Sequence, residues 1–194
     1  MHFNFRGVRL RISYYFVCSV VIFTALDKTR LYIPTIFFMM VHEAAHIIAL
    51  LIFGCKIVEV QLIIGAIGVK YADVTLSKLQ KIMSILMGPL SNLILSVIFL
   101  YYGCDIYFGI NLVLGLYNLL PLIGLDGGSL IQTFLEGIIS TKSVERTLII
   151  FTILAAVTLF FVTLLYVHVN INYTVLLFCI YLLMPIVIKK IVER

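Results

Sequence analysis

The chain has 194 residues, of which 63% are hydrophobic and only 12% are charged, and its mean hydropathy is +1.18. A soluble domain is nearer half apolar and a quarter charged, so this composition excludes one and indicates an integral membrane protein. The formal net charge of +5 is scattered along the chain without a basic patch interleaved with aromatic residues, which argues against a nucleic-acid partner.

Long apolar runs predict six transmembrane helices, at residues 10–26, 31–53, 82–102, 106–123, 147–167 and 171–188. Between the second and third runs, CKIVEVQLIIGAIGVKYADVTLSKLQ is rich in β-branched residues and interrupted by glycines. This composition favours an extended, hairpin-like segment at the membrane. We therefore expect an all-α integral membrane fold with one short β-hairpin, forming a single domain over residues 1–194.

The basic residues predict the orientation of the chain. With six spans, both termini lie on the same side of the membrane. If that side is the cytosol, the outer loops hold only Lys28 and Arg30 of the 14 basic residues, which leaves 12 for the cytosolic segments. Cytosolic loops of membrane proteins carry such an excess, so we expect both termini in the cytosol.

Three ionisable residues interrupt the second apolar run. His42 and His46 are four residues apart and so face one side of a helix, with Glu43 beside them. This is the H-E-x-x-H pattern, in which two imidazoles hold Zn²⁺ and the glutamate serves as general base. Ionisable groups at membrane depth usually mark function, although a hydrogen-bonded polar core is the alternative.

A catalytic zinc site usually has a third protein ligand, and Asp126 is the best candidate. It follows the apolar segment YNLLPLIGL and precedes Gly127 and Gly128, which permit close backbone approach. Pro121 is expected to interrupt the fourth helix. Taken alone, Asp126 is equally well explained as the N-cap of a short helix from Ser129 onward. With a zinc site to complete, we expect it to be the ligand.

These segments resemble the site-2 proteases, a family of intramembrane zinc metalloproteases. HEAAH resembles the zinc-binding helix of the family, NLLPLIGLDGG its Asn-Pro-Asp-Gly segment, and GPLSN (88–92) a further pattern on the helix between them. The resemblance covers residues 31–140, and the six-span layout is similar to the small subgroup that includes stage IV sporulation protein FB. No PDZ or CBS domain is recognisable, so regulation by nucleotide through a CBS domain is not expected.

The resemblance implies hydrolysis of a peptide bond of a membrane-tethered protein, in or near its transmembrane segment. Access from the cytosolic side of a bacterial cell membrane, a pro-sigma or other transcription factor as substrate, and inhibitory membrane proteins as partners would follow from it. The implied zinc ligands are His42, His46 and Asp126, with Glu43 as general base.

The tetrahedral oxyanion needs a hydrogen-bond donor besides zinc, and Asn118 is the candidate. A hydrogen bond between helices explains Asn118 equally well. The same two explanations apply to Asn92, for which the structural one is favoured.

Two other functions are compatible with the pattern. A membrane zinc transporter also places histidine and glutamate on its helices, but it usually needs metal-binding side chains on several spans. Here the fifth predicted span has only His168, near its outer end. An inactive scaffold that binds single-pass proteins needs no general base, so Glu43 argues against it.

Overall fold

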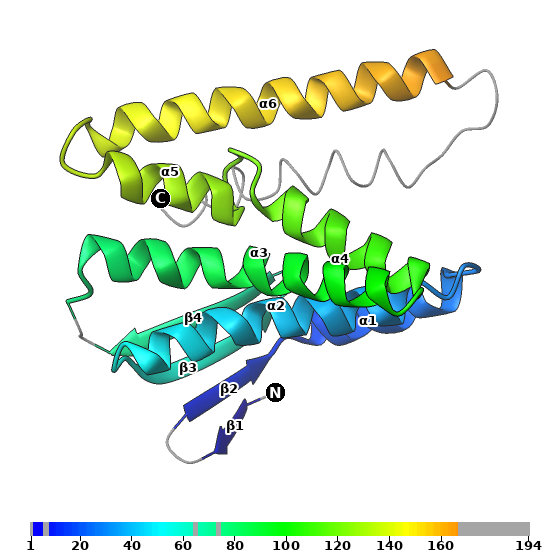
Figure 1. Ribbon diagram of the computed structural model, residues 1–194, viewed down its shortest axis with the longest axis horizontal. Helices are drawn as coiled ribbons and strands as arrows, with labels where there is room; N and C mark the ends of the chain where they lie inside the picture. The colour runs from blue at the N-terminus through cyan, green and yellow to red at the C-terminus, as the bar shows by residue number, and fades with distance from the viewer. Residues whose placement is uncertain (1, 6–7, 64–65, 73–74, 167–194) are drawn as a thin grey trace. The chain divides into compact units, whose positions relative to one another are not determined.

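The computed structural model describes residues 2–5, 8–63, 66–72 and 75–166. The chain divides into two compact units, Met1–Asn118 and Leu119–Arg194, and each is described by itself. The first unit holds strands β1 to β4 and helices α1 to α4, and the second holds α5 and α6, as labelled in Figure 1. The single domain expected from the sequence stays a prediction.

The first predicted span, 10–26, is only partly helical. The stretch VRLRI forms strand β2 (Val8–Ile12), and helix α1 (Tyr14–Leu26) follows it with 13 residues. In VRLRI the apolar residues are half-buried and the arginines exposed in strict alternation, as the period of a strand requires. At 1.5 Å per residue, α1 rises about 20 Å, which is less than the hydrocarbon thickness of a bilayer.

The strands form one sheet in the order β1-β2-β3-β4. Strand β1 (His2–Phe5) pairs antiparallel with β2, β2 pairs parallel with β3 (Lys56–Ile63), and β3 pairs antiparallel with β4 (Ala66–Ala72). The β3–β4 hairpin confirms the extended segment predicted after the second helix. The N-terminal pair of strands was missed, because apolar content alone assigned its residues to a helix.

A buried carboxylate links three of these strands. Glu59 on β3 is only 3% exposed, and its Oε1 lies 2.6 Å from Nε of Arg11 on β2. Gln61 donates a hydrogen bond to the same oxygen at 2.8 Å, and Nζ of Lys70 on β4 lies 3.8 Å from Oε2. The Gln61 hydrogen bond, with the charges of Arg11 and Lys70, holds the pKa of Glu59 below its ordinary value despite burial.

Three helices within the described residues are long and apolar enough to cross a membrane. They are α2 (Tyr32–Ile52), α3 (Lys78–Tyr101) and α6 (Thr141–Tyr166, of which 141–161 qualifies), and they match the second, third and fifth predicted spans. Helix α4 (Asp105–Asn118) has 14 residues and ends before Pro121 instead of reaching residue 123. The sixth predicted span, 171–188, lies outside the described residues, so the number of spans stays a prediction.

Helix α3 packs against both α2 and α4 in the first unit. Aromatic rings of Phe38, Phe99 and Tyr107, one from each helix, lie with their centroids 5.3 to 5.8 Å apart in edge-on contacts. The buried residues of α3 are small or polar rather than bulky: Ser84, Gly88, Pro89, Asn92 and Ser96. Most of them are four residues apart and therefore share one side of the helix, which lets α2 approach closely.

The second unit consists of a turn at 119–125, α5 (Asp126–Leu135) and α6. The backbone N–H of Ile123 donates a hydrogen bond to Oγ1 of Thr152 at 3.0 Å, and Thr152 is fully buried in α6. This bond fixes the turn against α6 just before α5 begins. Asp126 follows this anchored turn as the first residue of α5.

Candidate metal site

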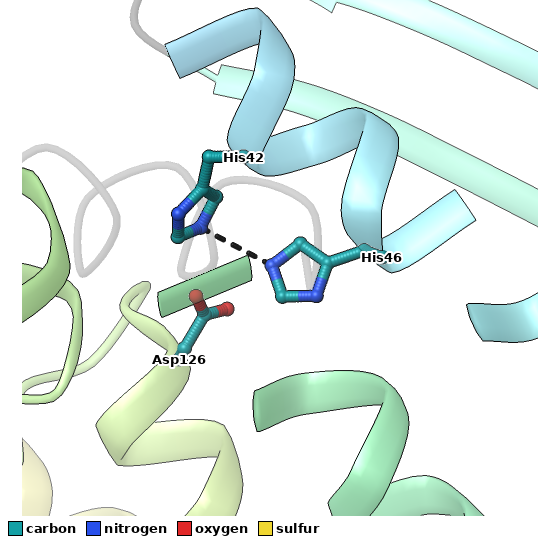
Figure 2. A group of neighbouring side chains, drawn as sticks. All are labelled: His42, His46 and Asp126. Atoms are coloured by element: carbon teal, nitrogen blue, oxygen red, sulfur yellow. Dashed lines mark hydrogen bonds between the residues drawn. The ribbon is translucent and has the colours of Figure 1, made fainter. Parts of the chain in front are cut away.

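Two imidazoles from α2 meet in the interior of the first unit. His42 is 3% exposed, His46 is half-buried, and their Nε2 atoms lie 3.2 Å apart. Figure 2 shows the rings turned toward each other. The angle between the two ring planes is 82°. The four-residue spacing on one helix accounts for this convergence, as predicted from the sequence.

Helix α3 holds each imidazole at its other nitrogen. Nδ1 of His46 lies 2.7 Å from the backbone carbonyl oxygen of Ser84, and Nδ1 of His42 lies 3.2 Å from Oδ1 of Asn92. A carbonyl oxygen can only accept, so each Nδ1 carries the ring hydrogen and donates it. In the neutral rings, Nε2 is then the acceptor nitrogen, and the two Nε2 atoms face each other at the contact drawn as a dashed line in Figure 2. The predicted hydrogen bond between helices at Asn92 is confirmed.

Two lone pairs at this distance need a positive partner, because two acceptors in contact repel each other. Nitrogen ligands of a tetrahedral zinc ion lie about 2.0–2.1 Å from the metal and therefore about 3.3–3.4 Å from each other. The 3.2 Å between the Nε2 atoms of His42 and His46 is close to this value. The donor types, their tautomers and their spacing thus fit a zinc ion.

Gly88 on α3 leaves the space in which the two Nε2 atoms meet. A Cβ atom at this position would lie 2.2 Å from Nε2 of His46 and 2.7 Å from Nε2 of His42. Carbon atoms in ordinary contact are about 3.5–4.0 Å from their neighbours, so any side chain here would displace the rings. The glycine of GPLSN is therefore a requirement of the histidine pair.

Glu43 directly follows His42 on α2 and is half-buried. Consecutive helical residues are about 100° apart around the axis, so Glu43 lies on the side of α2 next to that of the histidines. Its role as general base stays a prediction.

Asp126 is the first residue of α5 and is half-buried (labelled in Figure 2). The helix begins three residues before Ser129, and its N-cap is Leu125, so the alternative of Asp126 as N-cap is wrong. A carboxylate in the first turn is favoured by the positive end of the helix dipole. Its role as the third zinc ligand stays a prediction.

The glycines after Asp126 let the preceding turn cross the start of α5. A Cβ atom at Gly127 would lie 2.2 Å from the carbonyl oxygen of Leu119, and one at Gly128 would lie 2.2 Å from that of Leu122. Backbone atoms cannot give way as side chains can. The close backbone approach predicted from the paired glycines is confirmed, and it fixes the point at which Asp126 leaves the turn.

Asn118 is the last residue of α4 and is half-buried. Its Nδ2 donates a hydrogen bond to the carbonyl oxygen of Leu114 in the same helix, at 3.0 Å. This bond lies within one helix, whereas the sequence suggested a bond between helices. Nδ2 carries two hydrogens and this bond uses one of them, so the role as oxyanion donor stays a prediction.

Comparison with known proteins gives two similarities. Residues 103–163, which are 61 of the 194, match the family model described as Peptidase family M50. This segment includes Asn118, Pro121 and Asp126, and HEAAH lies outside it. The structure is similar to "Site-2 Protease from Methanocaldococcus jannaschii", with a TM-score of 0.69 and 16% sequence identity; the match covers 95% of this chain and 92% of that chain. A comparison with curated proteins found no match.

These similarities bear on the fold. At 16% identity, the likeness to the archaeal enzyme shows that the chain has the fold of a site-2 protease, a small sheet beside apolar helices. The three membrane-length helices are consistent with a membrane-embedded protein. The matched segment carries the Asn-Pro-Asp-Gly pattern on which the resemblance was based in part.

Sequence reasoning missed two groups of the histidine pair. One is the backbone carbonyl of Ser84, which has no residue-type signature. The other is Gly88, which the sequence presents only as the first residue of GPLSN. The available signal was the recurrence of Ser84, Gly88, Asn92 and Ser96 every four residues in an otherwise apolar helix, because small and polar residues at that spacing mark a close helix contact.

Proposed function

We propose that this chain is an intramembrane zinc metalloprotease that hydrolyses a peptide bond of a membrane-tethered protein in or near its transmembrane segment. One observation carries the proposal. On an apolar helix long enough to span a bilayer, two imidazoles anchored at Nδ1 present their Nε2 atoms 3.2 Å apart, and a glutamate follows the first of them. The M50 match and the site-2 protease fold support peptide hydrolysis.

Asp126 completes the set of zinc ligands in this proposal. The acid lies in the segment matched by the M50 family model and is half-buried at the start of a helix. Two neutral imidazoles and one carboxylate are a donor set that a catalytic zinc ion accepts, with one position left open. The carboxylate also compensates part of the charge of the ion inside the protein.

The protein groups then have distinct tasks. Bound zinc would polarise the scissile carbonyl and an attacking water molecule. Glu43 accepts a proton from that water and passes it to the leaving amine. Asn118 directs the second hydrogen of its amide toward the oxygen on which negative charge develops.

The substrate presents an extended chain, because the carbonyls of a transmembrane helix are occupied by its own hydrogen bonds. In this proposal the extended substrate pairs with the β3–β4 hairpin as an added strand. Since β3 lies between β2 and β4 in the sheet, β4 is the member of the hairpin at the edge. We therefore assign strand addition to Ala66–Ala72.

The finer features of the proposal follow the resemblance described above. Both termini and the access to the site lie on the cytosolic side, as the distribution of lysine and arginine suggests. The membrane is that of a bacterial cell, and the substrate is a pro-sigma or other membrane-tethered transcription factor in regulated intramembrane proteolysis of the sporulation type. Membrane proteins that inhibit the enzyme are further expected partners.

Substitution Glu43→Gln tests the reaction. We expect membranes containing the wild-type chain to cleave a co-expressed membrane-tethered substrate, and the Glu43→Gln chain to leave it intact while retaining its zinc content. Cleavage is followed by immunoblotting and zinc by elemental analysis of the purified chain. Crosslinking in membranes that contain the inactive chain then identifies the bound protein.

Glu136→Gln is the matched control, because Glu136 is an exposed glutamate outside the proposed site. It should cleave as the wild type does. Cleavage by Glu43→Gln at the wild-type rate would show that Glu43 is not the general base. Zinc uptake into vesicles that is insensitive to Glu43→Gln would instead indicate a transporter, and stable substrate binding by a wild-type chain that never cleaves would indicate a scaffold.

A further inference from the structure

The side of α3 that contacts the histidines has three positions at intervals of four residues: Ser84, Gly88 and Asn92. Residues at this interval lie one above another on a helix, and His42 and His46 have the same interval on α2. Asn92 contacts the earlier histidine and Ser84 the later one, with Gly88 facing both Nε2 atoms. The two helices are therefore antiparallel here.

We infer that Asn92 is a positioning residue, which keeps the ring hydrogen of His42 on Nδ1 and so directs the Nε2 lone pair to the metal. The inference rests on the metal-binding part of the proposed function. Nδ1 of His46 is held in the same way by a backbone carbonyl oxygen, that of Ser84, which no side-chain substitution removes. Of the two hydrogen bonds that hold the imidazoles, only the one to Asn92 depends on the identity of a side chain. The group responsible is the amide oxygen of Asn92, which accepts from Nδ1 of His42.

The hydrogen bonding of Asn92 supports this role over simple packing. The residue is 0% exposed, and its Nδ2 has no hydrogen-bond partner among the described residues. Its Oδ1, in contrast, accepts from Nδ1 of His42 and from Oγ of Ser91 at 3.4 Å. Leucine has a similar volume and would remove the unsatisfied Nδ2, but it would leave Nδ1 of His42 without its acceptor, so packing alone does not explain an asparagine with only its oxygen in use.

The test compares zinc affinity of the full chain in detergent micelles, by competition with a chelator, for wild type, Asn92→Leu and Asn92→Asp. We expect Asn92→Leu to bind zinc about 10–100-fold more weakly, the usual effect of losing a hydrogen-bond partner of a histidine ligand. Asn92→Asp keeps an acceptor oxygen and should recover most of the affinity. Equal affinity of Asn92→Leu and wild type would overturn the inference.

Asn111→Leu is the matched control. Asn111 is also 0% exposed, but it lies on α4 and donates to the carbonyl oxygen of Tyr107 in its own helix, at 2.9 Å. It should bind zinc as the wild type does. A loss equal to that of Asn92→Leu would assign both asparagines to packing and overturn the inference. If Asn92→Leu does not elute as a folded species in size-exclusion chromatography, Asn92→Ser takes its place. Serine also lacks the amide oxygen that accepts from His42, and it changes the polarity of the site less than leucine does.

Nitrogen-15 spectra of the histidines in the metal-free chain give a second readout that needs neither zinc nor activity. We expect His42 in the Nδ1–H form in the wild type and a mixture of tautomers in Asn92→Leu or Asn92→Ser. Predominance of the Nε2–H form in the wild type would overturn the inference. A wild-type chain that binds no zinc but shows the Nδ1–H form would refute the proposed function and leave this arrangement of hydrogen bonds standing.

Discussion

The glycine beside the histidine pair gives the sharpest prediction, for the substitution Gly88→Ala. The added methyl carbon would stand 2.2 Å from Nε2 of His46 and 2.7 Å from Nε2 of His42. Restoring an ordinary contact of about 3.5 Å requires a displacement of about 1 Å or more. The rings cannot yield freely, because Ser84 and Asn92 hold them at Nδ1.

A displacement of this size exceeds what a metal site tolerates, since ligand distances hold to within about 0.2 Å. Zinc affinity of Gly88→Ala should therefore fall by more than about 100-fold, the upper range for losing a single supporting contact. The strain should also make the metal-free chain about 1–3 kcal/mol less stable than a helical Gly→Ala change without a clash. Chelator competition measures the affinity, and thermal unfolding in the same micelles measures the stability.

Gly109→Ala is the comparison, because Gly109 is likewise helical and a Cβ there would have no neighbour within 4 Å. It should leave zinc affinity unchanged and raise stability by about 0.5–1 kcal/mol, the usual gain of alanine over glycine inside a helix. If Gly88→Ala bound zinc as tightly as Gly109→Ala, the metal would not lie between the two Nε2 atoms. That result would refute the reasoning from the histidine geometry.

Two more predictions concern acidic residues. Asp126→Asn should lower zinc occupancy by more than about 10-fold, because a neutral amide is a poor metal ligand in place of a carboxylate. The control is Asp105→Asn, at the equivalent first position of α4, which should leave zinc occupancy unchanged. If zinc occupancy were unchanged in Asp126→Asn, Asp126 would not be a zinc ligand and its role would be limited to the start of α5. The folded state holds the pKa of Glu59 below its ordinary value, so the ionised carboxylate stabilises the fold. This contribution is complete above the ordinary pKa and is lost as the pH falls through the lower pKa of the folded state. The difference in melting temperature between wild type and Glu59→Gln should therefore shrink on acidification to pH ~3. A difference that stayed constant with pH would show that the Glu59 charge is not stabilising.

Much of the fold was predictable from apolar length and glycine placement. The helix Tyr32–Ile52 matches its predicted span within one residue at each end, and the hairpin follows where β-branched residues and glycines replaced a helical pattern. The prediction failed at VRLRI, where the alternation of arginine with apolar residues was outweighed by the apolar run after it. A strand that joins a sheet through β3, about 50 residues later, is stabilised by a partner that local hydropathy does not describe.

For the candidate site, the sequence predicted which residues carry the chemistry. His42, Glu43 and His46 are recognisable because three ionisable groups are costly in an apolar helix, and Asp126 because two glycines follow it. The structure brings the two imidazoles together. It shows Asn118 bonded within its own helix and Asp126 inside the helix rather than capping it.

By itself, then, the sequence determined the membrane class, the helix of the histidines and the donor types offered to a metal, because hydropathy and the helical period act locally. The packing of α3 against α2 settles which nitrogen of each imidazole is held by α3 and which faces the other ring. That depends on a carbonyl of Ser84 and an amide oxygen of Asn92, contributed by another helix some 40 to 50 residues away, and on the missing side chain of Gly88. Hydrogen bonds between helices and the absence of an atom are properties of packing, and no local pattern in the helix of the histidines encodes them.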